Sequence, residues 1–165
     1  MALSASTNLP ADPQRVAEIF TDEAFVRHVS EKVGGSLESL TVDGDVAGAF
    51  TLTAVRSLPA NKLPDLAKKF VSGKLTVTQT EKWEPAATDG ARTANISLKV
   101  SGVPVDATAV QRLVPVDEGT RVELEGNVTS SIPFLGGKIA DAAEPKVGKA
   151  LNVQATEARS WLAQG

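Results

Sequence analysis

The pattern of the C-terminal segment, Ile132–Gly165, constrains the fold more than any other feature of this chain. A strand-like stretch ends at Pro133, the pair Gly136-Gly137 forms a hinge, and apolar residues then recur at steps of three and four, which predicts one long helix. The apolar stripe comprises Ile139, Ala143, Val147, Ala150, Leu151, Ala158, Trp161 and Leu162. About 25 helical residues form a rod of roughly 38 Å, about the width of a small domain. Because the preceding sequence is mostly strand-like, this helix must bury its stripe against a sheet.

Two short helices are predicted near the N-terminus, after a first strand over Leu3–Leu9. Asp12 is a favourable N-cap for the first helix, and Pro13 suits its first position, where a missing N–H costs nothing. Thr21 or Asp22 caps the second helix. The pair is expected to form a helical hairpin that braces one end of the sheet.

Alternating apolar and polar residues predict the remaining strands. They run over Leu37–Val42, Val46–Arg56, Leu75–Glu84, Thr93–Val100, Val105–Val116 and Arg121–Ile132. Turn residues such as Asp43-Gly44-Asp45 join most neighbours as hairpins, which favours antiparallel pairing. Pro59 and Pro64 prevent a regular strand, so Leu58–Lys69 is expected to be a long, partly helical connection. Gly126, on the inner face of the last strand, predicts a bulge or sharp curvature.

The order of these elements predicts an α+β fold. A curved antiparallel sheet of about seven strands would wrap around the long C-terminal helix, with the two short helices placed after the first strand. The length of 165 residues fits one domain, 1–165, with one core. Aromatic residues make up only 4% of the chain, so small residues must do most of the packing, which is consistent with a pocket between sheet and helix.

The composition excludes several classes of function. The net charge is −3 and no stretch clusters Lys and Arg, which argues against nucleic acid and against an anionic membrane surface as partners. The chain has no cysteine and a single histidine, so neither a metal site nor another cofactor is expected. No apolar run approaches the roughly 18 residues of a membrane span, and the N-terminus lacks the features of a signal peptide. A cytoplasmic location without stable membrane insertion is therefore expected.

Four local sequences carry a resemblance to a known superfamily. They are ADPQRVAEIFTDEAF over Ala11–Phe25, TEKW over Thr80–Trp83, GTRVEL over Gly119–Leu124 and SIPFLGGKI over Ser131–Ile139. With the order of elements, they resemble the START-like (SRPBCC) superfamily, which includes birch-pollen-type allergens, lipid-transfer domains and polyketide cyclase-like proteins. More narrowly, they look like an uncharacterised actinobacterial family within it. The resemblance covers essentially the whole chain and implies the helix-grip fold, with apolar or amphipathic small molecules bound between sheet and helix.

One residue departs from the superfamily pattern. Pro145 stands inside the predicted C-terminal helix, where proline removes one backbone hydrogen bond and clashes with the preceding turn. A kink or break near Asp141–Glu144 is therefore expected.

The strand over Leu75–Glu84 carries the candidate catalytic residues, Gln79 and Glu81, which share the parity of the apolar Val77 and Trp83. If the alternation holds, both polar side chains face the concave side. A carboxyl group there would have a raised pKa and could bind a ligand hydroxyl or act as a general acid or base. The alternative is a bulge that reverses the register and places both side chains in water, and the sequence favours this alternative slightly.

The strand parity or helix position of three further polar residues indicates where their side chains lie. Gln111 has inward parity and is a polar anchor in a pocket, the mark of a bulge or a rim residue. Arg112 has the opposite parity, so an internal Glu81–Arg112 pair is not expected. His28 flanks the buried side of its helix and is interpreted as a solvated surface residue.

The preferred hypothesis is a non-enzymatic carrier or sensor of an apolar or amphipathic small molecule, lipid-like or polyketide-like. The predicted lining residues are Phe50, Leu52, Val77, Trp83, Ile96, Leu98, Leu113, Leu124, Val147 and Leu151. One alternative is an enzyme of the cyclase or hydrolase kind that uses Glu81 or Gln79 in the same cavity. Another is a protein-interaction module whose interior is filled by side chains.

Overall fold

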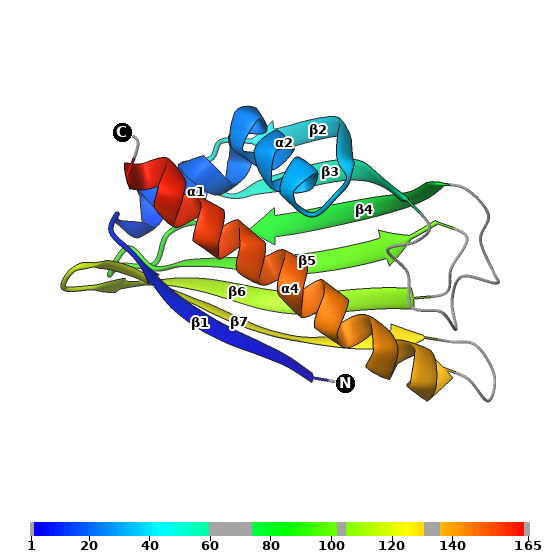
Figure 1. Ribbon diagram of the computed structural model, residues 1–165. Helices are drawn as coiled ribbons and strands as arrows, with labels where there is room; N and C mark the ends of the chain where they lie inside the picture. Colours follow the sequence, from blue (N-terminus) through cyan, green and yellow to red (C-terminus); the bar gives the residue numbers. More distant parts are fainter. Residues whose placement is uncertain (1, 60–73, 102–104, 131–135, 164–165) are drawn as a thin grey trace.

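A computed structural model describes residues 2–59, 74–101, 105–130 and 136–163 of the chain. Within these residues, seven strands form one curved antiparallel sheet in the order β1-β7-β6-β5-β4-β3-β2 (Figure 1). The strands are β1 (Ala2–Leu9), β2 (Ser36–Gly44), β3 (Phe50–Pro59), β4 (Lys74–Trp83), β5 (Arg92–Val100), β6 (Val105–Val116) and β7 (Gly119–Ser130). From β2 to β7, strands that are consecutive in the sequence are also neighbours in the sheet, as in a series of hairpins. Strand β1 pairs with β7 at the edge of this series.

The two short helices after β1 are α1 (Pro13–Thr21) and α2 (Glu23–Lys32). Asp12 caps α1, because its Oδ1 accepts a hydrogen bond from the Arg15 backbone N–H at 2.8 Å. Asp22 rather than Thr21 caps α2, since its Oδ1 accepts from the Phe25 N–H at 3.2 Å. The predicted helical hairpin is therefore confirmed at this end of the sheet.

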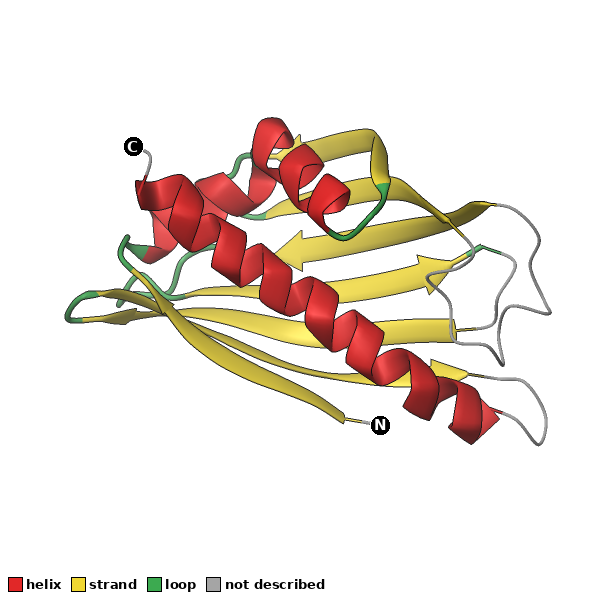
Figure 2. Ribbon diagram, viewed as in Figure 1, coloured by secondary structure: helices red, strands yellow, loops and turns green. Residues whose placement is uncertain are grey.

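The long C-terminal helix, α4 (Gly136–Ala163), crosses the concave face of the sheet diagonally (Figure 2). It packs mainly along β7 and β1, and its C-terminal half also contacts α1 and α2. Ala158 is buried, and the Trp161 ring meets the Phe25 ring edge-on with a centroid separation of 5.6 Å. The core thus lies between the concave face and the three helices α1, α2 and α4, which confirms the predicted α+β helix-grip class.

The predicted break at Pro145 is wrong, because α4 is one continuous helix from Gly136 to Ala163 with Pro145 inside it. Pro145 and Asp141 are both exposed, so they lie on the solvent side of the helix. The backbone carbonyl that loses its partner to proline can be hydrated on that side.

Gly126 does not mark a bulge either. The pairing of β7 with β6 and with β1 runs through Ala109↔Gly126 and Leu3↔Gly126 without a shift. A Cβ at Gly126 would lie 2.3 Å from Thr108 O and 2.8 Å from Ala109 Cβ. The glycine therefore permits a close approach of the two strands that a side chain at this position would prevent.

Two predicted segments differ from the structure at their ends. Strand β3 begins at Phe50 rather than Val46, because a turn starts at Asp45. In this turn the Asp45 side chain accepts a hydrogen bond from the Ala47 N–H, and the Asp45 carbonyl accepts one from the Gly48 N–H. Most of the connection predicted over Leu58–Lys69 lies outside the described residues, although β3 itself extends to Pro59.

Candidate functional site

Strand β4 directs three polar or amphipathic side chains onto the concave face. Its pairing with β3 and with β5 is continuous along the strand, so Gln79, Glu81 and Trp83 all keep the inward parity of Leu75. Gln79 is 8% exposed and Glu81 is 1% exposed. The alternative that a bulge places Gln79 and Glu81 in water is therefore wrong, because nothing interrupts the alternation.

These side chains belong to a chain of hydrogen bonds that we call the concave-face network: Ser30, Arg56, Gln79, Glu81 and Trp83. Trp83 Nε1 donates to Glu81 Oε1 at 2.9 Å, and Gln79 Nε2 donates to Glu81 Oε2. Arg56 Nη1 donates to Gln79 Oε1 at 2.8 Å, and Arg56 Nε donates to Ser30 Oγ at 2.7 Å. The network thus joins β4, β3 and α2 across the interior.

Burial dominates the electrostatics of this network. Removal from water raises the pKa of the Glu81 carboxyl above its ordinary value, while the hydrogen bonds from Trp83 and Gln79 and the charge of Arg56 oppose that rise. Burial likewise lowers the pKa of the Arg56 guanidinium, and the charge of Glu81 opposes this change. The site therefore holds a carboxyl group biased toward protonation beside a partly buried cation.

Arg56 was not among the predicted site residues. It has the same parity in β3 as Phe50, Leu52 and Ala54, so the alternation already placed it on the concave face. The sequence signal for Arg56 was that a charged residue continues a series of inward-facing apolar positions. The expectation that Arg112 does not pair with Glu81 agrees with the structure, in which Arg112 is exposed and the nearby charge that acts on Glu81 is that of Arg56.

A second polar feature lies under α4. Gln111 is 3% exposed, and its Nε2 has no hydrogen-bond partner within the described part of the chain. It borders a cavity of about 30 Å³. The cavity is lined by Ser6, Thr7, Phe20, Gln111, Val122, Leu124, Asn152, Gln154 and Ala155. The interpretation of Gln111 as a rim residue is therefore wrong.

The sequence reasoning singled out only Gln111 and Leu124 among the residues of this cavity, and Gln154 is a missed residue for which the sequence holds a signal. It occupies the position of the apolar stripe between Leu151 and Ala158, where the spacing calls for a residue that faces the sheet. A polar residue in register with the stripe was the available signal.

The predicted lining residues have different environments. Phe50, Leu52, Trp83, Ile96, Leu113 and Leu124 are buried, and Val77 and Leu98 are half-buried. Val147 and Leu151 belong to α4, but their side chains lie outside what the structure describes. Of this set, Leu124 lines the cavity at Gln111. The role of the ten predicted lining residues in ligand binding stays a prediction.

One end of the concave face is closed by packing. The rings of Phe50 and Trp83 stack at 5.5 Å, and the Arg92 guanidinium lies 5.6 Å from the Trp83 ring. Arg92 is 1% exposed and donates hydrogen bonds to the carbonyl groups of Val46 at 2.9 Å and Gly48 at 2.8 Å. The accessible part of this face is therefore toward Val77 and Leu98.

His28 is not the fully solvated residue that was expected. Its Nε2 lies 3.3 Å from Glu157 Oε1, and its ring centroid lies 5.7 Å from that of Trp161. Because α4 packs beside α2, a residue on the flank of α2 meets α4 instead of open water. This contact depends on the docking of two distant segments, which the sequence pattern does not show.

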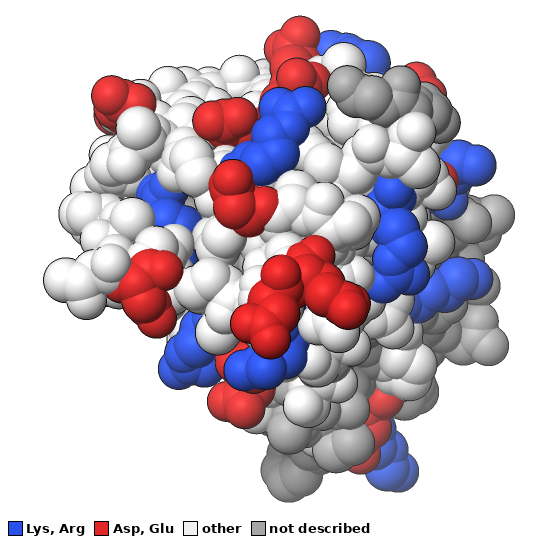
Figure 3. Space-filling view, turned by 90° about the vertical axis from the view of Figure 1, so that its left-hand side faces the viewer, with Lys and Arg blue, Asp and Glu red and all other residues white. Residues whose placement is uncertain are grey.

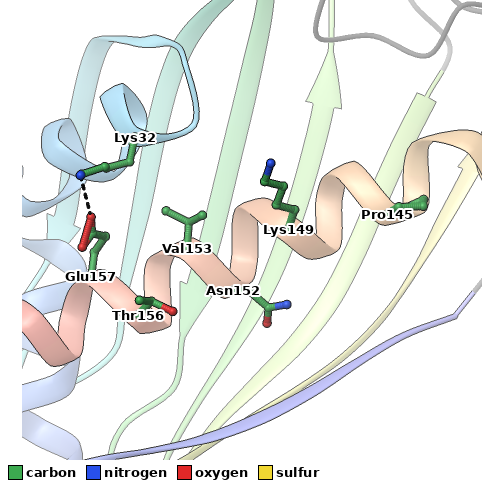
Figure 4. A pocket seen from close by; sticks show the side chains of 7 residues that line it. All are labelled: Lys32, Pro145, Lys149, Asn152, Val153, Thr156 and Glu157. Carbon is green, nitrogen blue, oxygen red and sulfur yellow. Dashed lines mark ion pairs between the residues drawn. The ribbon is translucent and has the colours of Figure 1, made fainter.

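A groove runs along the outer side of α4 next to α2. It encloses about 530 Å³ and is lined by Lys32, Pro145, Lys149, Asn152, Val153, Thr156 and Glu157. Figure 4 shows the Lys32–Glu157 ion pair, 3.6 Å long, that joins the two helices across one end of the groove. Lys32 is more than half exposed, so water screens this pair and it contributes little to stability.

The surface charges, the metal-ligating residues and the helices each give one observation. Acidic and basic side chains are interspersed over the end of the molecule seen in Figure 3, unlike the basic surface that binds nucleic acid. Among the described residues, no three His, Asp or Glu side chains are grouped so that they could hold a metal ion. None of the helices in the described part of the chain is long and apolar enough to cross a membrane.

The architecture defines the class of protein. An antiparallel sheet curved around a C-terminal helix, with two short helices after β1, is the helix-grip fold of START-like proteins. A STAR-related lipid transfer protein from Xanthomonas axonopodis has the same fold, with a TM-score of 0.62, 17% identity, and coverage of 97% of this chain and 84% of that one. A Thalictrum norcoclaurine synthase is also similar, with a TM-score of 0.53, 12% identity, and coverage of 98% and 92%. At these identities, the likeness shows the fold alone.

The family follows from the sequence comparison. The model of the family described as protein of unknown function DUF2505 matches residues 4–162, and the chain belongs to this family. An uncharacterised protein of Mycobacterium tuberculosis is 28% identical over 131 residues, which cover 77% of this chain and 75% of the relative. A Mycobacterium bovis protein matches over the same length with the same identity. These relatives agree with the expected actinobacterial family.

Proposed function

We propose that this protein, acting as a single START-like domain over residues 1–165, binds an apolar or amphipathic small molecule between the sheet and α4. The concave-face network carries the proposal, because it places a buried carboxyl and a partly buried guanidinium on an otherwise apolar face. A few convergent polar groups in an apolar recess are typical of sites that orient a small molecule. The lipid transfer protein and the norcoclaurine synthase, which share the fold, support the same role.

The accessible residues suggest how the ligand lies. Val77 and Leu98 are half-buried apolar side chains on the concave face, and Leu98 pairs with Gln79 across β4 and β5. The apolar part of the ligand would rest on these two side chains, and burial of its surface would drive binding by about 25 cal/mol per Å² before entropic costs. A polar group at this end of the ligand would meet Arg56 and Gln79 of the network.

The test is a titration with N-phenyl-1-naphthylamine, a neutral apolar probe whose fluorescence rises on burial. Leu98→Trp adds bulk to the concave face and should weaken probe binding at least tenfold, which corresponds to about 1.4 kcal/mol. Lys99→Trp adds the same bulk one residue along β5, on the outer face, and should bind like the wild type. Unchanged binding by a folded Leu98→Trp variant would show that the pocket lies elsewhere.

Native mass spectrometry of protein purified from its own host gives an independent test. A discrete bound mass that disappears after organic extraction is the expected result. A clean protein mass, together with no uptake of the fluorescent probe, would instead favour an interaction domain with a filled core.

A second candidate function is an enzyme of the cyclase or hydrolase kind. The raised pKa of Glu81 favours it, because a carboxyl group biased toward protonation suits general acid or base catalysis. Both Glu81 oxygens already accept hydrogen bonds from Trp83 and Gln79, however, which makes the binding role the better supported one. An enzyme would convert the compound extracted from it, and Glu81→Gln would abolish that conversion while probe binding persists. No conversion of the extracted compound by the wild type would indicate a binding role alone.

A further inference from the structure

The cavity under α4 has a feature that the concave-face network does not explain. Gln111 Nε2 is buried on its wall and has no partner among the described residues. Native proteins rarely leave a buried amide donor without an acceptor, so an orphaned group of this kind indicates a water or a ligand atom that completes it. Ala94 and Leu124, the neighbours of Gln111 across β5 and β7, are apolar and offer the donor no side-chain acceptor.

The lining of this cavity is polar but uncharged. Its polar members are Ser6, Thr7, Gln111, Asn152 and Gln154, and no ionisable side chain is among the residues that border it. Arg159 lies outside the lining on the exposed side, where its Nη2 donates to Thr7 Oγ1 at 2.6 Å and Asn8 O at 2.9 Å. A charged group brought into this cavity would lose its hydration without meeting an opposite charge.

We propose that the Gln111 cavity is a subsite for one uncharged oxygen of the ligand, a ketone, ester or amide carbonyl that accepts a hydrogen bond from Gln111 Nε2. This inference rests on the proposed function. Its size fits the assignment, because about 30 Å³ accommodates a group little larger than a water molecule.

The subsite also orients the rest of the molecule. Ala94, the partner of Gln111 on β5, precedes Leu98 by four residues, which is about 13 Å along the strand. A linear chain of this length would join Gln111 to the half-buried Leu98, provided that the buried side chain of Ile96 between them moves to admit it. The uncharged lining of the cavity disfavours an anionic head group. The preferred class is thus a neutral carbonyl compound with an apolar tail, rather than a fatty-acid anion.

The experiment compares 2-undecanone, decanoate and undecane as competitors of N-phenyl-1-naphthylamine at pH 8. The wild type should bind the ketone more tightly than either of the other two. Gln111→Met keeps the length of the side chain but removes the donor, and it should weaken ketone binding about three- to tenfold while undecane binding is unchanged. Asn127→Met, which replaces an exposed amide on the outer face of β7, is the matched control and should bind all three like the wild type.

A second variant tests the direction of the hydrogen bond. Gln111→Glu keeps the shape of the side chain but presents oxygen atoms in place of the donor, so it should also weaken ketone binding selectively. A wild type that prefers decanoate, or variants that weaken ketone and undecane equally, would overturn the inference and leave the proposed function standing. If none of the three compounds displaces the probe and the probe itself does not bind, the proposed function fails and the inference with it.

Discussion

Replacing Glu81 with glutamine should change how the stability of this protein depends on pH. Glu81 is 1% exposed, and burial raises its pKa above the ordinary value of 4.5. Between that value and the higher folded-state pKa, the folded protein holds a proton on Glu81 that the unfolded chain has released. Raising the pH therefore favours unfolding of the wild type by up to about 1.4 kcal/mol per pH unit in this window. Glutamine does not titrate and removes this slope.

The glutamine variant also carries a loss that does not depend on pH. In the wild type, both Glu81 oxygens accept hydrogen bonds, from Trp83 and from Gln79. A glutamine at this position offers one oxygen and one amide nitrogen, so one of the two donors loses its acceptor, at a cost of about 1–3 kcal/mol. The variant should therefore be less stable than the wild type near pH 4, and this deficit should shrink as the pH rises.

Urea unfolding followed by tryptophan fluorescence measures both effects, at half-unit steps from pH 4 to pH 8 and constant ionic strength. Glu118→Gln, which removes an exposed carboxylate from the turn between β6 and β7, is the control for a general charge effect. A stability difference that stays flat across this range would refute the raised pKa. A deficit that grows with pH would show that Arg56 and the two hydrogen-bond donors outweigh desolvation.

Two further predictions concern the scaffold around the site. Arg92→Met should lower the free energy of unfolding by about 2 kcal/mol or more in the same urea assay, because it removes the guanidinium that donates to the half-buried carbonyls of Val46 and Gly48. The Val46 carbonyl keeps its hydrogen bond from Gln14 Nε2; a loss below about 1 kcal/mol would mean that water replaces the guanidinium. Gly126→Ala should lower the free energy of unfolding by about 1–3 kcal/mol, because its Cβ would meet Thr108 O at 2.3 Å. An unchanged thermal midpoint for Gly126→Ala would show that β6 and β7 can separate at this point without penalty.

The sequence predicted the inward faces of the strands well where the alternation is regular. Ala94 and Ile96 on β5, and Val122 and Leu124 on β7, are all buried as expected. The same alternation also placed Arg56 and Gln111 inward. These two positions were undervalued because a polar residue with inward parity can equally mark a bulge, and a single sequence does not distinguish the two.

The docking of segments that are distant in sequence was not predictable in this way. The contact of His28 with Glu157 joins α2 to α4, and the hydrogen bond from Arg56 to Ser30 joins β3 to α2. Neither pair has a spacing in the sequence that would bring it together. The continuity of α4 through Pro145 also depends on packing, because an isolated helix would be expected to bend or break there.

The sequence by itself determined the type and order of the elements, because periods of two and 3.6 residues and capping residues are properties of neighbouring positions. The tertiary structure alone decided which polar groups meet. Cross-strand register aligned Gln79 with Ala54 and Leu98, and the diagonal course of α4 placed Gln154 on the same cavity as Gln111. Register and helix docking are fixed by the free energy of burying whole faces, which sums over many residues and cannot be assigned to any local pattern.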